Sequence, residues 1–192
     1  MNTKEYQSKI FDSLNEIFEE EDVKKEWDSL KYDSHTSNHK QIYGPRLDIA
    51  VGPFNGMVEL DTPLDNTEVM KNHLFTKRIV EEIAWDKKDF NKCWNDFSRC
   101  YLAIEIELGS NKKSSNSLKH ILGSIINASV SGSIGIVITD TFTVKKVNRL
   151  YYYLLRLKHL ELLEVKTLDN LIIIDKDEFS MILSEIKEQL AS

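Results

Sequence analysis

The sequence has few cysteines, which can cross-link a small fold, and few prolines, which often mark its turns. Only two of its 192 residues are cysteines, Cys93 and Cys100, and only three are prolines. Two cysteines cannot build a disulfide framework, and a zinc site would need two further ligands at a recognisable spacing. We therefore expect two reduced thiols.

Long apolar runs are also missing. No stretch approaches the roughly 18 to 20 apolar residues that a membrane-spanning helix needs. The first residues, Met-Asn-Thr-Lys-Glu-Tyr-Gln, lack the apolar segment of a secretory signal. The sequence thus predicts a cytoplasmic protein that does not enter a membrane.

Positive charge is not in excess. The formal net charge is -6, from 25 Lys and Arg against 31 Asp and Glu. This excludes a protein that coats nucleic acid by bulk electrostatics, because non-specific affinity comes mainly from cations at phosphates. It leaves open an enzyme that acts on nucleic acid, since a local cluster such as Lys112, Lys113 and Lys119 matters more than the sum.

What is present is an ordinary globular composition, 41% hydrophobic and 29% charged, which predicts one domain over residues 1–192. Apolar spacing in the first half predicts a helix near 3–21, a strand over 47–51 and a returning strand over 56–60. A helical insert at about 62–99 follows, with helices over 66–85 and 89–98.

The second half predicts strands alternating with helices. A strand over 100–109, a helix from 118 to about 131 and an apolar strand over 134–139 form a βαβ unit, which makes the two strands parallel neighbours. A helix over 143–158, short strands over 162–165 and 171–174, and a helix over 177–190 complete the chain. The fold class is α/β, with a mixed central sheet flanked by helices.

Three carboxylates stand out within this framework. Glu105 and Glu107 alternate with apolar residues, so their side chains point to the same side of a strand, roughly 6 to 7 Å apart. Asp48 interrupts another apolar strand, where aspartate is disfavoured. If the faces of these adjacent strands agree, the three side chains converge.

Converging carboxylates in a partly buried cleft repel one another and lose hydration, so they either take up protons or bind a divalent cation. Oxygen ligands suit Mg²⁺, with Mn²⁺ as the alternative, and a metal-activated water would hydrolyse a phosphodiester. Lys112 or Lys113, shortly after the strand, could hold the phosphate, and His120 is a weaker acid or base candidate.

Asp48, the Glu105-Ile106-Glu107 run and the following helix with Ser117-Leu118-Lys119-His120 resemble the PD-(D/E)XK nuclease superfamily over roughly residues 3–139. The family pattern is Pro-Asp, followed later by an acid, any residue and Lys. Here Leu47 precedes Asp48, with Pro45 three positions before it. Glu107 occupies the Lys position, as in a branch of type II restriction enzymes.

This resemblance implies a restriction-endonuclease-like fold and Mg²⁺-dependent hydrolysis of DNA, with RNA as the other possible substrate. Asp48, Glu105 and Glu107 would be the metal ligands, with Glu107 also orienting or deprotonating the attacking water, and Lys112 would complete the catalytic set. A homodimer is implied as well, because symmetric cutting of a duplex needs two sites. The helical insert would supply DNA specificity or the dimer surface.

Two other functional interpretations remain open at this stage. The chain could be a degenerate member of the same fold that binds nucleic acid or protein without cleaving, because the motif Lys is missing. It could also be an unrelated α/β interaction protein whose glutamates are solvated on an exposed strand face. Base stacking by the run Tyr151-Tyr152-Tyr153 is a further alternative to a mainly structural role.

Overall fold

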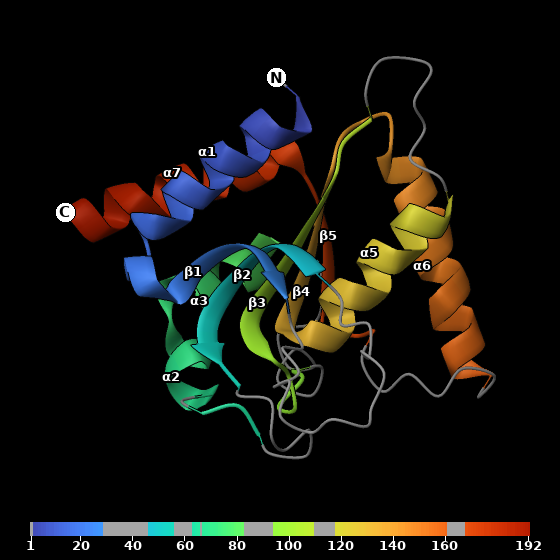
Figure 1. The fold of residues 1–192 in the computed structure, drawn as a ribbon, viewed down its shortest axis with the longest axis horizontal. Helices are drawn as coiled ribbons and strands as arrows, with labels where there is room; N and C mark the ends of the chain where they lie inside the picture. The colour runs from blue at the N-terminus through green and yellow to red at the C-terminus, as the bar shows by residue number, and fades with distance from the viewer. Residues whose placement is uncertain are drawn as a thin grey trace, which may run out of the picture.

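A computed structural model describes residues 2–28, 46–55, 63–65, 67–82, 94–109, 118–160 and 168–192, without the side chains of residues 81 and 82. Figure 1 shows the arrangement of the helices and strands. In chain order these are α1 (Thr3–Asn15), the 3₁₀ turn η1 (Glu20–Asp22), β1 (Val23–Asp28), β2 (Arg46–Phe54), α2 (Thr67–Asn72), α3 (Leu74–Glu82), β3 (Cys100–Glu107), α5 (Leu118–Ser131), β4 (Gly132–Thr139), α6 (Val144–His159), β5 (Leu171–Asp175) and α7 (Lys176–Ala191).

One mixed five-stranded sheet organises the described residues, in the order β1-β2-β3-β4-β5. The pairs β1–β2 and β2–β3 are antiparallel, whereas β3–β4 and β4–β5 are parallel. The strand that carries the two glutamates, β3, therefore lies in the centre of the sheet, between an antiparallel and a parallel neighbour.

Helices cover both faces of this sheet. In Figure 1, α1 and α7 lie side by side on one face, while α5 and α6 lie on the other. Local sequence explains where two of these helices begin. Asn2 and Glu5 form a reciprocal capping box at the start of α1, and the Asp175 side chain accepts a hydrogen bond from the Asp177 amide at the start of α7.

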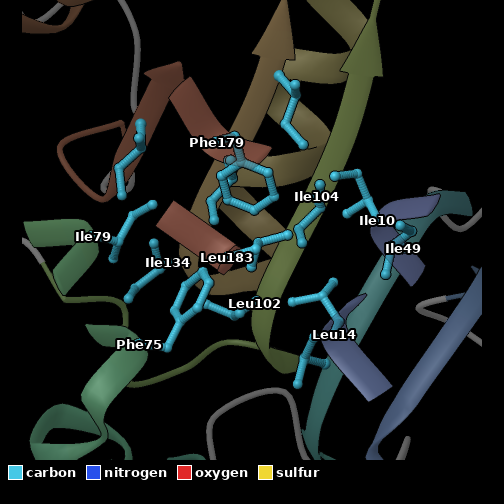
Figure 2. Close-up of a cluster of buried hydrophobic side chains, with 14 of the residues drawn as sticks. Ile10, Leu14, Ile49, Phe75, Ile79, Leu102, Ile104, Ile134, Phe179 and Leu183 are labelled. Atoms are coloured by element: carbon cyan, nitrogen blue, oxygen red, sulfur yellow. The ribbon is translucent and has the colours of Figure 1, made fainter. Parts of the chain in front are cut away.

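The larger core lies between the sheet and helices α1, α3 and α7. Figure 2 shows side chains from all three helices meeting those of the central strands. Alternate residues of β3 and β4 point into it, as expected for strands with a period of two. Its buried members include Ile10, Leu14, Ile49, Phe75, Ile79, Leu102, Ile104, Ile134, Phe179 and Leu183.

A second, smaller core lies under α5 and α6, where Ile121, Ile125, Val137, Val147 and Leu154 are buried. Because β4 contributes Val137 here and its even-numbered isoleucines to the larger core, it is buried on both faces. This agrees with the prediction made from its continuous apolar run.

The parallel β3–α5–β4 unit, the helix over 143–158, the strand over 171–174 and the C-terminal helix are confirmed, with bounds shifted by a residue or two. Asp48 and the two glutamates do lie on adjacent strands. The predicted strands over 56–60 and 162–165 lie outside the described residues.

Three predictions for the N-terminal half are wrong. The first helix ends at Asn15 instead of continuing to residue 21, and the edge strand β1 that follows was not predicted. The helix over 66–85 is two helices, α2 and α3. Residues 94–98 of the predicted helix over 89–98 form a turn, and the rest of that segment lies outside the described residues.

Two glycines make a sharp test of how α5 packs on β4. A Cβ atom at Gly135 would lie 2.6 Å from the backbone oxygen of Ala128 in α5, whereas one at Gly123 meets nothing within 4 Å. Gly135→Ala should therefore destabilise the fold by about 1 to 3 kcal/mol through overpacking. Gly123→Ala, inside a helix, should stabilise it by roughly 0.5 to 1 kcal/mol.

Urea unfolding of both variants beside the unaltered protein measures this difference. Equal midpoints for the two alanine variants would contradict the close packing of α5 on β4.

Among the described helices, none combines the length and apolar character needed to cross a membrane.

Candidate active site

The two glutamates lie on the α5 side of β3. Ile104 and Ile106 belong to the larger core, so Glu105 and Glu107 occupy the opposite face. Each is only 6% exposed. The alternative in which these glutamates are solvated on an open strand face is therefore wrong. Both carboxyl groups are enclosed between the strand and the helix.

Helix α5 supplies a polar partner to each glutamate. The Ser124 hydroxyl donates to Glu107 Oε1 at 2.5 Å, and Asn127 Nδ2 donates to Glu105 Oε1 at 3.2 Å. Because Ser124 and Asn127 are three residues apart, they share a helix face. Sequence reasoning missed both residues. The sequence does contain a signal for Ser124. It lies between Ile121 and Ala128 on the apolar face of the predicted helix, where a hydroxyl without a hydrogen-bond partner would cost free energy.

Asp48 reaches the same region from β2. Ile49 lies opposite Ile104, so Asp48 and Glu105 occupy the next position along this antiparallel pair. Asp48 Oδ2 accepts a hydrogen bond of 2.8 Å from the Ile106 amide. The regular pairing of β2 with β3 ends at Ile49 and Ile104. Beyond that point the Asp48 carboxylate, instead of a backbone carbonyl, accepts the hydrogen bond from β3.

Edge strand β1 adds a fourth carboxylate, Glu26, which sequence reasoning also missed. The ladder of β1 with β2 places Glu26 beside Asp48, and Glu26 has a positive φ of 48°. Gln7 Nε2 of α1 donates to Glu26 Oε1 at 3.1 Å and to the Asp48 carbonyl at 2.9 Å. Arg46 pairs with the other oxygen of Glu26. Helix α1 and Arg46 thus fix the backbone that presents Asp48.

The carboxylates influence one another's ionisation. Burial raises the pKa of Glu105 from 4.5 to about 9, and the charge of Asp48 and then that of Glu107 add to this shift, although the hydrogen bond from Asn127 opposes it. Burial also raises the pKa of Asp48, from 3.8 to about 6, against the hydrogen bond from Ile106. In contrast, the hydrogen bond from Gln7 lowers the pKa of Glu26. At neutral pH Glu105 therefore holds a proton.

The other predicted residues lie in several parts of the chain. Lys112 and Lys113 lie outside the described residues. His120 and Lys119 are exposed in the first turn of α5. Trp94, within the predicted helical insert, is buried in the larger core. Cys100 is a buried free thiol, as expected, and Cys93 lies outside the described residues.

The chemistry of this cluster suits a hard divalent cation, because Asp48, Glu105 and Glu107 offer only oxygen donors. Within the described ranges, however, no group of three Asp, Glu, His or Cys side chains is arranged to hold a metal ion. Each carboxylate is instead engaged by a protein donor: the Ile106 amide, Asn127 or Ser124. Metal binding would require the glutamates to exchange these hydrogen bonds, and Glu105 to lose its proton.

The fold and this cluster define an α/β protein with a buried acidic site between a mixed sheet and one helix. No protein-family model matches the chain, and neither the curated proteins nor the solved structures contain a significant match to it.

Proposed function

We propose that this protein is a metal-dependent endonuclease of the restriction-endonuclease-like class that hydrolyses DNA with Mg²⁺. The observation that carries the proposal is the convergence of Asp48 from β2 with Glu105 and Glu107 from β3, close enough that the charges of Asp48 and Glu107 add to the raised pKa of Glu105. The mixed sheet with helices on both faces is consistent with that class.

The cluster is poorly explained as a stabilising feature. Burying several carboxyl groups together costs free energy, and within the described part of the chain no arginine or lysine forms a salt bridge with Glu105. Strongly perturbed carboxyl groups such as those of Glu105 and Asp48 concentrate at functional sites. A divalent cation would offset the mutual repulsion of these carboxylates.

Each residue has a defined role in this proposal. Asp48 and Glu105 would hold the cation, and Glu107 would complete its ligands and orient the attacking water. A bound Mg²⁺ supplies an acidified water and charge stabilisation at the scissile phosphate. Ser124 and Asn127 hold the glutamates in place until that exchange. Lys112, which would contact the phosphate, remains a prediction from the sequence.

Asp48→Asn tests this assignment most directly. The asparagine keeps an oxygen that can accept the Ile106 hydrogen bond, so the backbone should be preserved while an anionic ligand is lost. Altering even indirect partners of metal ligands typically costs 10- to 100-fold, so loss of a direct ligand should lower plasmid nicking by more than about 100-fold. Nicking of supercoiled DNA is measured in Mg²⁺, Mn²⁺ and EDTA.

Asp12→Asn, an exposed change of the same kind on α1, is the matched control and should cut as fast as the unaltered protein. Nicking that persists in EDTA or in Asp48→Asn would overturn the proposal. Binding of DNA or RNA without any metal-dependent nicking would favour the degenerate, non-cleaving member. One observation favours that alternative. Glu107 accepts a hydrogen bond from Ser124, and no group of side chains in the described part of the chain is arranged to hold a metal ion.

The proposal includes a dimer, since cutting both strands of a duplex symmetrically needs two copies of the site. Sedimentation velocity with and without a duplex oligonucleotide in EDTA would measure the number of chains bound.

A further inference from the structure

Helix α6 differs in charge from the rest of the chain. The segment Val144–His159 carries five cationic residues, Lys145, Lys146, Arg149, Arg156 and Lys158, and no Asp or Glu, although the whole chain has a net charge of -6. Such a concentration of one sign on a single helix is an electrostatic footprint that bulk composition conceals.

The cations are arranged on the helix face that points away from the protein. Lys145, Arg149, Tyr152 and Arg156 follow the spacing i, i+4, i+7 and i+11, and all four are exposed. The opposite face buries Val147, Tyr151 and Leu154 against α5 and the sheet. Figure 1 shows α6 on the outer side of α5. The exposure of all four residues places this stripe on the solvent-facing side of α6.

The stripe is not neutralised by the described part of the protein. Lys158, which lies off the stripe, pairs with Asp169, but no described carboxylate pairs with Lys145, Arg149 or Arg156. Aromatic side chains adjoin these cations. Tyr152 is 68% exposed and Tyr153 is 57% exposed. Helix formation does not require an exposed tyrosine at either position.

The stripe starts beside the acidic site. Glu107 lies opposite Thr139 at the ends of β3 and β4, and the Gly109 amide donates to Asp140 Oδ2 at 2.8 Å. Phe142, 74% exposed, lies against Gly109 just before α6 begins. The first turn of α6 and the glutamate end of β3 are therefore at the same edge of the sheet.

We propose that the Lys145–Arg149–Tyr152–Arg156 stripe of α6 is a docking surface for double-stranded DNA, with its cations at the phosphates. This proposal rests on the proposed function in one respect, namely that the bound duplex is the substrate. A helix of 16 residues is about 24 Å long and roughly 10 to 12 Å wide. The major groove, about 12 Å wide, accepts such a helix.

The structure favours a nucleic acid over an anionic membrane as the partner. A helix binds a membrane interface by burying its apolar face in the lipid. The apolar face of α6 is already buried in the smaller core, which leaves only charge and two tyrosines for the partner. Arginine, lysine and tyrosine side chains are common donors to DNA phosphates.

The test is binding of a fluorescent duplex oligonucleotide, followed by anisotropy in EDTA so that no cleavage contributes. A variant carrying Lys145→Gln, Arg149→Gln and Arg156→Gln should bind at least about tenfold more weakly. It should also reduce the slope of log affinity against log salt by about 2.7, which is 0.9 for each of three lost phosphate contacts.

The matched control carries Lys9→Gln, Lys77→Gln and Lys187→Gln, which removes the same charge from α1, α3 and α7 on the other face of the sheet. It should keep the unaltered affinity and slope. An equal loss in both triple variants, or no loss in the stripe variant, overturns the docking surface. So does tighter binding to vesicles of anionic phospholipid than to the duplex. The binding measurement in EDTA separates the two proposals, because it does not depend on nicking. Weaker duplex binding by the stripe variant alone supports the docking surface even where the unaltered protein fails to nick DNA.

Discussion

Glu105→Gln should make the protein more resistant to heat at pH 8 in EDTA and, at the same time, inactive in Mg²⁺-dependent nicking. The two effects share one cause. Glutamine has the shape of the protonated glutamate that the folded protein holds at neutral pH, and it cannot become the anion that a metal site requires.

The sign of the stability effect follows from the pKa. In the folded protein Glu105 has a pKa of about 9, against 4.5 for an unperturbed side chain. Between these values the unfolded chain releases a proton that the folded protein retains, so stability in EDTA falls as pH rises from about 4.5 to about 9. Glutamine removes this loss. At pH 8 the gain should be about 2 kcal/mol or more, which raises Tm by roughly 4 to 8 °C.

Thermal unfolding at pH 5 and pH 8 measures the effect, and Glu188→Gln on the exposed surface of α7 is the control. The Glu105→Gln advantage should be small at pH 5 and large at pH 8, whereas the control should follow the unaltered protein. A variant less stable than the unaltered protein at both pH values would mean that Glu105 is ionised and paired in the folded state. Undiminished nicking by a stable variant would remove Glu105 from the site.

The sequence was most informative where local pattern and buried surface agree. The β3–α5–β4 unit is predictable because its apolar residues alternate along β3, repeat at helical spacing along α5 and run without interruption in β4. Short connections then leave little choice but a parallel pair. The adjacency of Asp48 and Glu105 was likewise predicted from element order and was confirmed.

Edge strand β1 was missed for a physical reason. Lys24 and Lys25 are consecutive and both exposed. Lysines protect a sheet edge from pairing with other strands, but two in a row remove the apolar alternation that identifies a strand. The regular alternation of β1 is also broken at Glu26, whose positive φ no pattern rule anticipates. Without β1 in the prediction, Glu26 and its partner Gln7 could not be associated with Asp48.

Burial of the glutamates was the other feature that the sequence left undecided. An Ile-Glu-Ile-Glu pattern is expected both for a strand with one solvent-exposed face and for a strand covered by a helix. The alternation shows which face of the strand a side chain occupies, but not whether another element covers that face. Ser124 and Asn127 resolve the question, since they show that α5 presents hydrogen-bond donors at the two carboxyl groups. Two polar residues on the apolar face of the following helix therefore indicate that the glutamates of an Ile-Glu-Ile-Glu strand are covered.

Mg²⁺ affinity should rise about 200-fold from pH 6 to pH 8. Glu105 must lose its proton to become a ligand, and below a pKa of about 9 each pH unit changes the deprotonated fraction tenfold. Asp48, with a pKa of about 6, adds a factor of about two at the lower end. Asn127, Asp48, Glu107 and Glu26 all act on Glu105, and only Asn127 favours its anion.

Isothermal titration calorimetry with Mg²⁺ in two buffers of different ionisation enthalpy would measure both the affinity and the protons released. Near pH 7 about one proton should leave for each ion bound, because Glu105 is protonated and Asp48 is mostly ionised. Glu188→Gln should behave as the unaltered protein does. In Glu105→Gln the release should fall to about 0.1 proton, and any remaining affinity should change no more than about threefold with pH, since only Asp48 then titrates. Affinity independent of pH in the unaltered protein would contradict the protonated state of Glu105, and a complete lack of Mg²⁺ binding at pH 8 would remove the basis for metal-dependent catalysis at these carboxylates.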